Sequence, residues 1–167
     1  MNARAFIELL DGQGAHASPL GCISDLSAES AGRRVAGFPH SIFDLTFHLN
    51  FWMDYDLRRM QGRPLPYPEH ASGSWPADAP PVDESRWSKT VEAFASPLGQ
   101  VEQLARSDSA GLARAIEPTH PFHAERASAL GDVLWQLLAH NSYHVGQIVM
   151  LRRMLGLWPP RAGGDTW

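Results

Sequence analysis

The sequence predicts an all-α fold, and within that class a four-helix bundle formed by one domain over residues 1–167. Two long stretches place apolar residues three and four positions apart, which is the spacing of an amphipathic helix. Two further stretches show this spacing with interruptions, and no segment alternates apolar and polar residues convincingly enough to predict a sheet. The hydrophobic content of 44% suits a domain with a sizeable core. Helices of this kind cover their apolar faces by packing against one another.

The first long helix is predicted from Ser41 to about residue 61. Asp44 follows Ser41 by three residues, a variant of the capping box that satisfies free N–H groups at a helix start. Gly62 and Pro64 provide the end of the helix. Asp44 and His48 fall on the stripe next to the apolar face of this helix. That apolar face is formed by Ile42, Leu45, Leu49, Trp52 and Met53.

The last helix is predicted over residues 125–156, where apolar residues keep helical spacing throughout. Gly156 and the two prolines that follow at positions 159 and 160 end it. One stripe of this helix carries His140, His144 and Gln147. The helix therefore places polar side chains at inward-looking positions of an otherwise apolar segment, and these side chains need partners.

An interrupted helical region is predicted near the start of the chain. Residues 3–30 carry regularly spaced apolar side chains, but Gly12, Gly14 and Pro19 interrupt them. Glycine and proline weaken or stop helices, so these three residues either divide the helix or move its start.

The remaining helix is predicted over residues 85–106, with a kink near Pro97. Between it and the first long helix, residues 63–81 contain six prolines. A segment of this length and composition is expected to run as an irregular crossover, because proline removes a backbone donor and fixes φ. The crossover joins the second helix of the predicted bundle to the third.

Composition and charge exclude several classes of partner. Lys and Arg number 14 against 18 Asp and Glu, a net charge of −4, and the arginine pairs are scattered, so no nucleic-acid partner is expected. The most apolar run, residues 133–139, is far shorter than the ~20 residues that cross a bilayer, so no membrane partner is expected. Cys22 is the single cysteine, and the N-terminal residues lack the apolar core of a signal peptide. A cytoplasmic location is therefore expected.

The most informative residues are His140 and His144. Four residues apart on a helix, they point the same way and lie about 6 Å apart along its axis, a workable separation for sharing one metal ion. His48 is a third inward histidine on a separate helix, and metal sites in helix bundles are built from facing helices. Either a hydrogen-bond network or a metal must satisfy the three rings. Three imidazole ligands leave a coordination position open, as in a catalytic site.

Four other residues carry weaker signals. Asp44 lies one turn before His48 and is the carboxylate that can be placed near the histidines as a general base, although helix capping competes for it. Gln147 either orients a bound water or substrate, or hydrogen-bonds a ligand imidazole. His16, near a helix boundary, is the further histidine to consider for the site, and the other four are expected at the surface. Cys22 is expected to be buried and unreactive.

Two runs in the long helices are specific enough to suggest a family. They are His40-Ser41-Ile42 followed by His48, and His140-Asn141-Ser142-Tyr143-His144-Val145-Gly146-Gln147-Ile148. In these runs the chain resembles the DinB/YfiT-like metalloenzymes, and the resemblance extends over nearly the whole sequence. It implies an up-down-down-up four-helix bundle, a divalent metal on His48, His140 and His144, and frequently a homodimer. The wider superfamily includes thiol S-transferases that use bacillithiol or mycothiol, a mycothiol-dependent maleylpyruvate isomerase, and proteins classed as hydrolases.

Three functions are compatible with such a site. In the first, zinc or nickel lowers the pKa of a low-molecular-weight thiol cosubstrate, which attacks a small electrophile. In the second, the metal activates water for hydrolysis, with a carboxylate such as Asp44 as general base. In the third, the protein holds a metal or small ligand without chemistry, as in a stress response. No His-Glu-x-x-His arrangement is present, which argues against a metalloprotease.

Overall fold

The computed structural model describes residues 2–77, 83–120 and 128–164. Most of these residues are helical, which confirms the all-α prediction. A small antiparallel ladder was not predicted: β1 (Ala115–Ile116) pairs with β2 (Ser128–Ala129). Strands of two residues are too short to show the alternation from which a strand is predicted. Among the described helices, none is long and apolar enough to cross a membrane.

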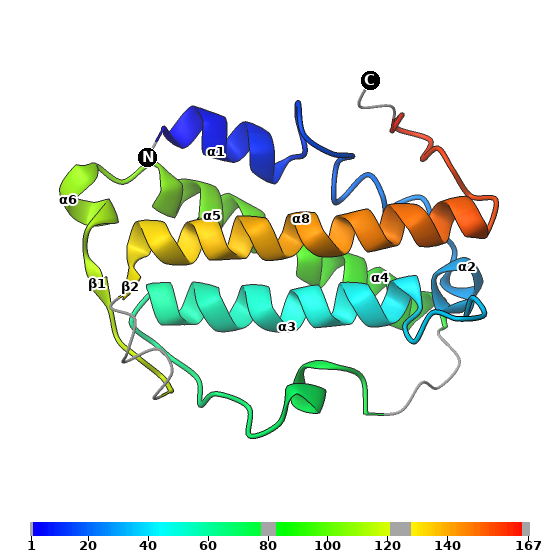
Figure 1. Cartoon of the computed structure of the whole chain (residues 1–167), viewed down its shortest axis with the longest axis horizontal. Helices are drawn as coiled ribbons and strands as arrows, with labels where there is room; N and C mark the ends of the chain where they lie inside the picture. The colour runs from blue at the N-terminus through cyan, green and yellow to red at the C-terminus, as the bar shows by residue number, and fades with distance from the viewer. Residues whose placement is uncertain (1, 78–82, 121–127, 165–167) are drawn as a thin grey trace.

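The two long helices, α3 (Ile42–Met60) and α8 (Leu130–Met154), lie side by side and run in opposite directions (Figure 1). α3 begins with the predicted capping box. The Asp44 N–H donates to the Ser41 hydroxyl at 3.2 Å, and the Ser41 N–H donates to the Asp44 carboxylate at 2.9 Å. α8 extends to within two residues of its predicted end, while residues 125–127 of the predicted helix lie outside the described residues.

The N-terminal helical region is divided into α1 (Ala3–Leu10) and α2 (Ala28–Gly32), with turns between them. Gly12 explains the division. Its φ of +85° is a conformation that favours glycine, and a Cβ at this position would lie 2.6 Å from the backbone oxygen of His16. The chain therefore leaves the helix at a point where only glycine fits.

The helical region before the ladder is broken at Pro97, where a kink was predicted. α4 (Glu84–Ala95) ends just before this proline, and α5 (Leu98–Ala105) begins just after it. The short helix α6 (Ser109–Leu112) follows and leads into β1. Because proline lacks an N–H and clashes with the preceding turn, one continuous helix is replaced by two.

Residues 61–77 connect α3 to the region of α4 and contain the 3-10 helix η1 (Ala71–Ser74). This segment runs beside α3, and η1 packs against α3 (Figure 1). Pro80 and Pro81, the last prolines of the predicted crossover, lie outside the described residues. The connection carries Trp75 to the middle of α3, next to the histidines described below.

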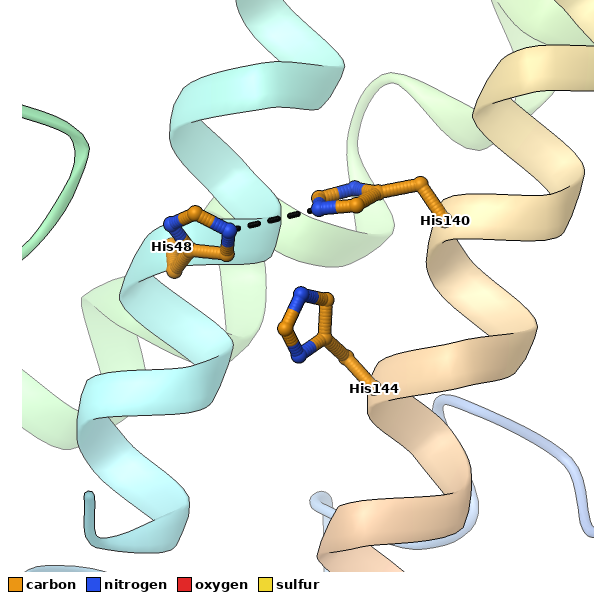
Figure 2. A group of neighbouring side chains, drawn as sticks. All are labelled: His48, His140 and His144. Atoms are coloured by element: carbon orange, nitrogen blue, oxygen red, sulfur yellow. Dashed lines mark hydrogen bonds between the residues drawn. The ribbon is translucent and has the colours of Figure 1, made fainter. Parts of the chain in front are cut away.

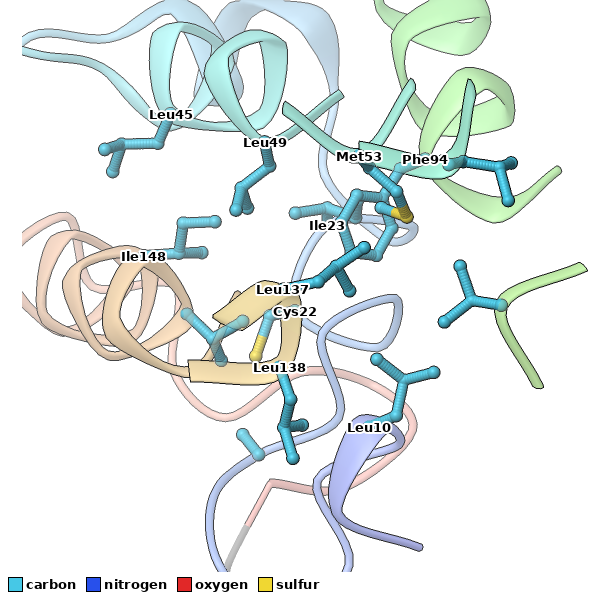
Figure 3. Close-up of a cluster of buried hydrophobic side chains, with 14 of the residues drawn as sticks. Leu10, Cys22, Ile23, Leu45, Leu49, Met53, Phe94, Leu137, Leu138 and Ile148 are labelled. Atoms are coloured by element: carbon cyan, nitrogen blue, oxygen red, sulfur yellow. The ribbon is translucent and has the colours of Figure 1, made fainter. Parts of the chain in front are cut away.

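The hydrophobic core lies where α3, α8, α1, α4 and the segment after α1 meet. Truncating a large side chain in such a core costs about 2–5 kcal/mol, so these contacts fix the spacing of the two long helices. The histidines lie on neighbouring stripes of the same two helices and are therefore held by a packed scaffold. Core residues include Leu10, Cys22, Ile23, Leu45, Leu49, Met53, Phe94, Leu137, Leu138 and Ile148 (Figure 3).

Candidate metal centre

Three histidine side chains converge between the two long helices. His48 comes from α3, while His140 and His144 come from α8, and the three rings point into the space between the helices (Figure 2). One ligand nitrogen from each ring can be chosen so that all three lie within 4.8 Å of one another. The structure thus brings together the three residues that the sequence predicted as metal ligands.

The closest pair of nitrogens has a spacing that suits a shared cation. The Nε2 atoms of His48 and His140 are 3.2 Å apart. Two nitrogens that each lie 2.0–2.1 Å from a tetrahedrally coordinated zinc ion are about 3.4 Å apart. The two helices therefore already hold these imidazoles near the separation that coordination requires. The donor set of three imidazoles also suits zinc, nickel and related divalent ions.

Two of the imidazoles are oriented by carbonyl oxygens on their outer side. His48 Nδ1 lies 3.3 Å from the backbone oxygen of Ser74 in η1, and His144 Nδ1 lies 2.7 Å from Oε1 of Gln147. A carbonyl oxygen accepts hydrogen bonds only, so each Nδ1 carries the proton and donates it. Each Nε2 is then left with a lone pair, which is the form of histidine that binds metals. The lone pair of His48 Nε2 accepts a hydrogen bond from His140 Nε2 at 3.2 Å (Figure 2), so a metal ion at this site would replace the proton that the two rings share.

The electrostatic environment keeps the rings neutral. Burial, followed by the charge of His144, lowers the pKa of His48 to about 4. Burial, followed by the charges of His144 and His48, also lowers the pKa of His140 to about 4. The pKa of His144 is lowered chiefly by burial as well. Metal ions compete with protons for imidazole, so depressed pKa values favour metal binding at neutral pH.

An aromatic stack that the sequence reasoning missed holds the ring of His48. Trp75 lies 3.9 Å from this ring at an interplanar angle of 10°, and His40 stacks on Trp75 at 3.7 Å and 8°. This stacking buries one face of the His48 ring against Trp75. Trp75 stands in the irregular connection, where no periodicity indicates its position. His40 was expected at the surface, although it belongs to one of the two family-like runs.

The other predicted site residues have separate roles. Asp44 completes the capping box and pairs with Arg34 at 2.9 Å, so its carboxylate is already engaged. His16 lies 2.9 Å from the hydroxyl of Ser142 and is not part of the histidine cluster. Cys22 is fully buried, and burial raises its pKa to about 11, which makes its thiol inert at neutral pH.

The fold and the histidine cluster define a helical protein of the class that can hold a divalent metal ion between facing helices. A family model of the DinB superfamily matches residues 15–148. The chain therefore belongs to the DinB superfamily, which confirms the family indicated by the two sequence runs. Comparisons with curated proteins and with solved structures gave no match.

Proposed function

We propose that the protein binds one divalent metal ion, zinc or nickel, through the Nε2 atoms of His48, His140 and His144. The observation that carries this proposal is the pair of outer hydrogen bonds, from His48 to Ser74 and from His144 to Gln147. These bonds leave the Nε2 atoms of His48 and His144 unprotonated and close to the ring of His140, so a metal ion can take the place of the proton between His48 and His140. Membership of the DinB superfamily supports the same assignment.

We further propose a thiol S-transferase type of reaction on small electrophiles. The metal, when bound, would supply a site that lowers the pKa of a low-molecular-weight thiol cosubstrate. The chain itself provides no reactive sulfur, because its single cysteine, Cys22, is buried and has a raised pKa. Three protein ligands leave room for a fourth, and a cavity of about 400 Å³ adjoins His140. A small substrate can therefore reach the histidines.

Hydrolysis is the weaker alternative within this proposal. It needs a general base beside the attacking water, and Asp44 was the candidate. The contacts of Asp44 are with the Ser41 N–H and with Arg34, which favour its capping role. If neither a thiol reaction nor hydrolysis is found, the remaining function is the binding of a metal or small ligand without catalysis.

The proposal includes the family's four-helix topology and a homodimer. The interrupted pairs α1–α2 and α4–α5, together with α3 and α8, supply the helices for an up-down-down-up bundle. A dimer is supported by large apolar side chains that remain exposed on one side of α8. With a rotation of about 100° per residue, these side chains lie within an arc of about 100° around the axis of α8. These side chains are Trp135, Tyr143, Met150 and Met154.

The reaction is tested by mixing the zinc- or nickel-loaded protein with bacillithiol or mycothiol and a chromogenic electrophile. Conjugate formation should depend on the metal and should be lost in His144→Ala. His16→Ala is the matched control, because His16 is a half-buried histidine outside the cluster, and it should keep full activity. If His144→Ala bound no metal yet conjugated at the wild-type rate, the site would not be the catalyst. Metal binding without any conjugate formation would contradict the S-transferase reaction and leave the non-catalytic binding function.

A further inference from the structure

A cavity of about 400 Å³ continues the histidine site by one to two helical turns. On α3, Trp52 and Asp56 follow His48 at intervals of four residues, and on α8 Gln136 precedes His140 by four. Residues spaced by four share a helix face, and the two helices run in opposite directions, so these side chains meet on one side of the histidines. All but His48 line the cavity. A molecule in the cavity would therefore touch His140.

The cavity has aromatic walls. Trp52, Tyr55 and Tyr67 line it, and their ring centroids are 5.3 to 5.9 Å apart. Tyr55 is tied to Thr119 by a hydrogen bond between their hydroxyl groups, which fixes one wall. Aromatic faces carry partial negative charge and attract cations as well as apolar groups.

Asp56 places a carboxyl group in the same cavity. Its exposed fraction is 5%, and its nearest charged partner is Arg59, whose Nη1 lies 3.8 Å from one carboxylate oxygen. That distance is longer than a hydrogen bond, and no group in the described parts of the chain donates a hydrogen bond to this carboxylate. Arg59 does not line the cavity, whereas Asp56 does. The carboxyl group thus faces the cavity without a donor.

The charged form of Asp56 is poorly stabilised in this position. Burial raises its pKa to about 7, and the charge of Arg59 only partly opposes the shift. A ligand that brings a positive charge and N–H donors would supply what the chain does not. A neutral apolar ligand would leave the carboxyl group without a donor, and an anionic ligand would be repelled by it. The pattern of aromatic faces with one buried carboxylate is suited to an ammonium group.

We propose that this cavity holds the small substrate of the histidine site and selects molecules that carry a protonated amino group, which Asp56 binds. The proposal deepens the proposed function and rests on it for the reaction at His140. Recognition of the amine itself requires no metal. The amino group belongs either to the electrophile or to the thiol cosubstrate, and the two sources can be separated by the choice of probe.

The test compares three probes of the same shape on the full-length protein by isothermal titration calorimetry. Benzylamine is cationic, benzyl alcohol is neutral and benzoate is anionic. Benzylamine should bind at least about tenfold more tightly than the alcohol, because the ion pair forms in a buried site, and benzoate should bind most weakly. Equal affinities, or the tightest binding by benzoate, would overturn the proposal.

Variants assign the preference to Asp56. Asp56→Asn should lower benzylamine affinity at least about tenfold and leave benzyl alcohol within about twofold, because the amide keeps the shape and removes the charge. Asp54→Asn is the matched control on the exposed side of α3, where Asp54 pairs with Arg58. Gln136→Trp, which fills the cavity mouth, should abolish binding of all three probes. Unchanged benzylamine binding in either Asp56→Asn or Gln136→Trp would place the amine elsewhere and contradict the proposal.

Two additions distinguish this proposal from the proposed function. The titrations are run on protein treated with a chelator and again with zinc added, while bound zinc is measured separately. Amine selectivity without zinc binding would contradict the metal site and support the amine-binding cavity. Zinc binding without amine selectivity would support the metal site and contradict the amine-binding cavity.

Cysteamine is then compared with 2-mercaptoethanol on the zinc-loaded protein. Preference for cysteamine identifies the thiol as the amine carrier, and equal binding of the two, with benzylamine selectivity retained, identifies the electrophile.

Discussion

Two buried polar clusters lie along α8, and they are satisfied in different ways. Near the end of the helix, the Arg152 guanidinium donates to the backbone oxygens of Leu157 and Cys22 and to both oxygens of the Asp25 carboxylate. In the middle of the helix, His140 and His144 meet His48 with their ring nitrogens turned toward one another. The arginine cluster is complete within the chain. In the proposed function, the histidine cluster takes its remaining partner, a metal ion, from outside the chain.

The largest effect is expected from breaking the arginine cluster. Arg152→Met keeps much of the side-chain volume but removes the cation from the Asp25 carboxylate, which keeps the Arg161 N–H as a donor, and it should lower the free energy of unfolding by about 3 kcal/mol. Urea unfolding monitored by circular dichroism measures this loss. Arg153→Met is the control, because the neighbouring Arg153 lies over the ring of Trp158 at the surface and should cost no more than about 1 kcal/mol. A folded Arg152→Met protein that had lost its metal would show that the two clusters are not independent.

Breaking the histidine cluster should affect metal affinity and not stability. His140→Ala removes a ligand whose Nε2 lies 3.2 Å from that of His48, and it should weaken zinc binding by more than about 100-fold, beyond the usual loss for an outer-sphere partner. Competition with a chromophoric chelator measures the affinity. Helix content should not change, as followed by circular dichroism. Wild-type affinity in this variant would remove His140 from the ligand set.

The metal-free protein should become less stable as the pH falls from about 6.5 to about 4. The pKa values of His48 and His140 are lowered to about 4 in the folded chain, so between these limits the unfolded chain binds more protons. The contribution of these two histidines to the free energy of unfolding is fully present above pH 6.5 and is lost as the pH falls through 4. Asp56, with a pKa raised to about 7, acts in the opposite direction.

The comparison that isolates the histidines is therefore between wild type and His140→Phe, both metal-free, in thermal melts from pH 4 to 8. The melting temperature of the variant should fall less on acidification, because one of the depressed groups is gone. Parallel curves for the two proteins would show that His140 is not a buried neutral imidazole.

A smaller effect is expected from the residue that orients His144. Gln147→Leu removes the acceptor of the His144 Nδ1–H at 2.7 Å and should weaken metal binding about 10- to 100-fold while leaving one site per chain. Gln147→Glu keeps an acceptor and should restore most of the affinity. Complete loss of the site in Gln147→Leu would mean that Gln147 itself binds the metal.

The contrast between the clusters also shows what the sequence could predict. Helical spacing located α3, α8 and all three histidines, because i, i+4 pairs report directly on a shared face. Spacing carries no information on contacts between distant segments. The pairing of Arg152 with Asp25 spans 127 positions, and Ser74 and Trp75 reach His48 from an irregular connection. Those contacts depend on how the segments pack.

Asp56 is a different case, because its signal was present in the sequence. It stands eight residues after His48, on the same stripe of a helix whose bounds were predicted closely. The carboxylate nearest to His48 along the chain, Asp44, received the role of candidate base instead, and the structure engages it in a cap and an ion pair. The ladder of β1 and β2 gave no signal, since each strand has two residues.

We propose that the three histidines form one metal site with an open position. The most direct measurement is a titration of the metal-free protein with Co²⁺, followed by visible absorption spectroscopy. We expect intense bands of a four- or five-coordinate ion, saturation at one equivalent per chain, and a spectral change when a thiol is added. Weak bands of an octahedral aqua-type ion with no saturation would contradict it, and the histidines would then be a polar network within the core.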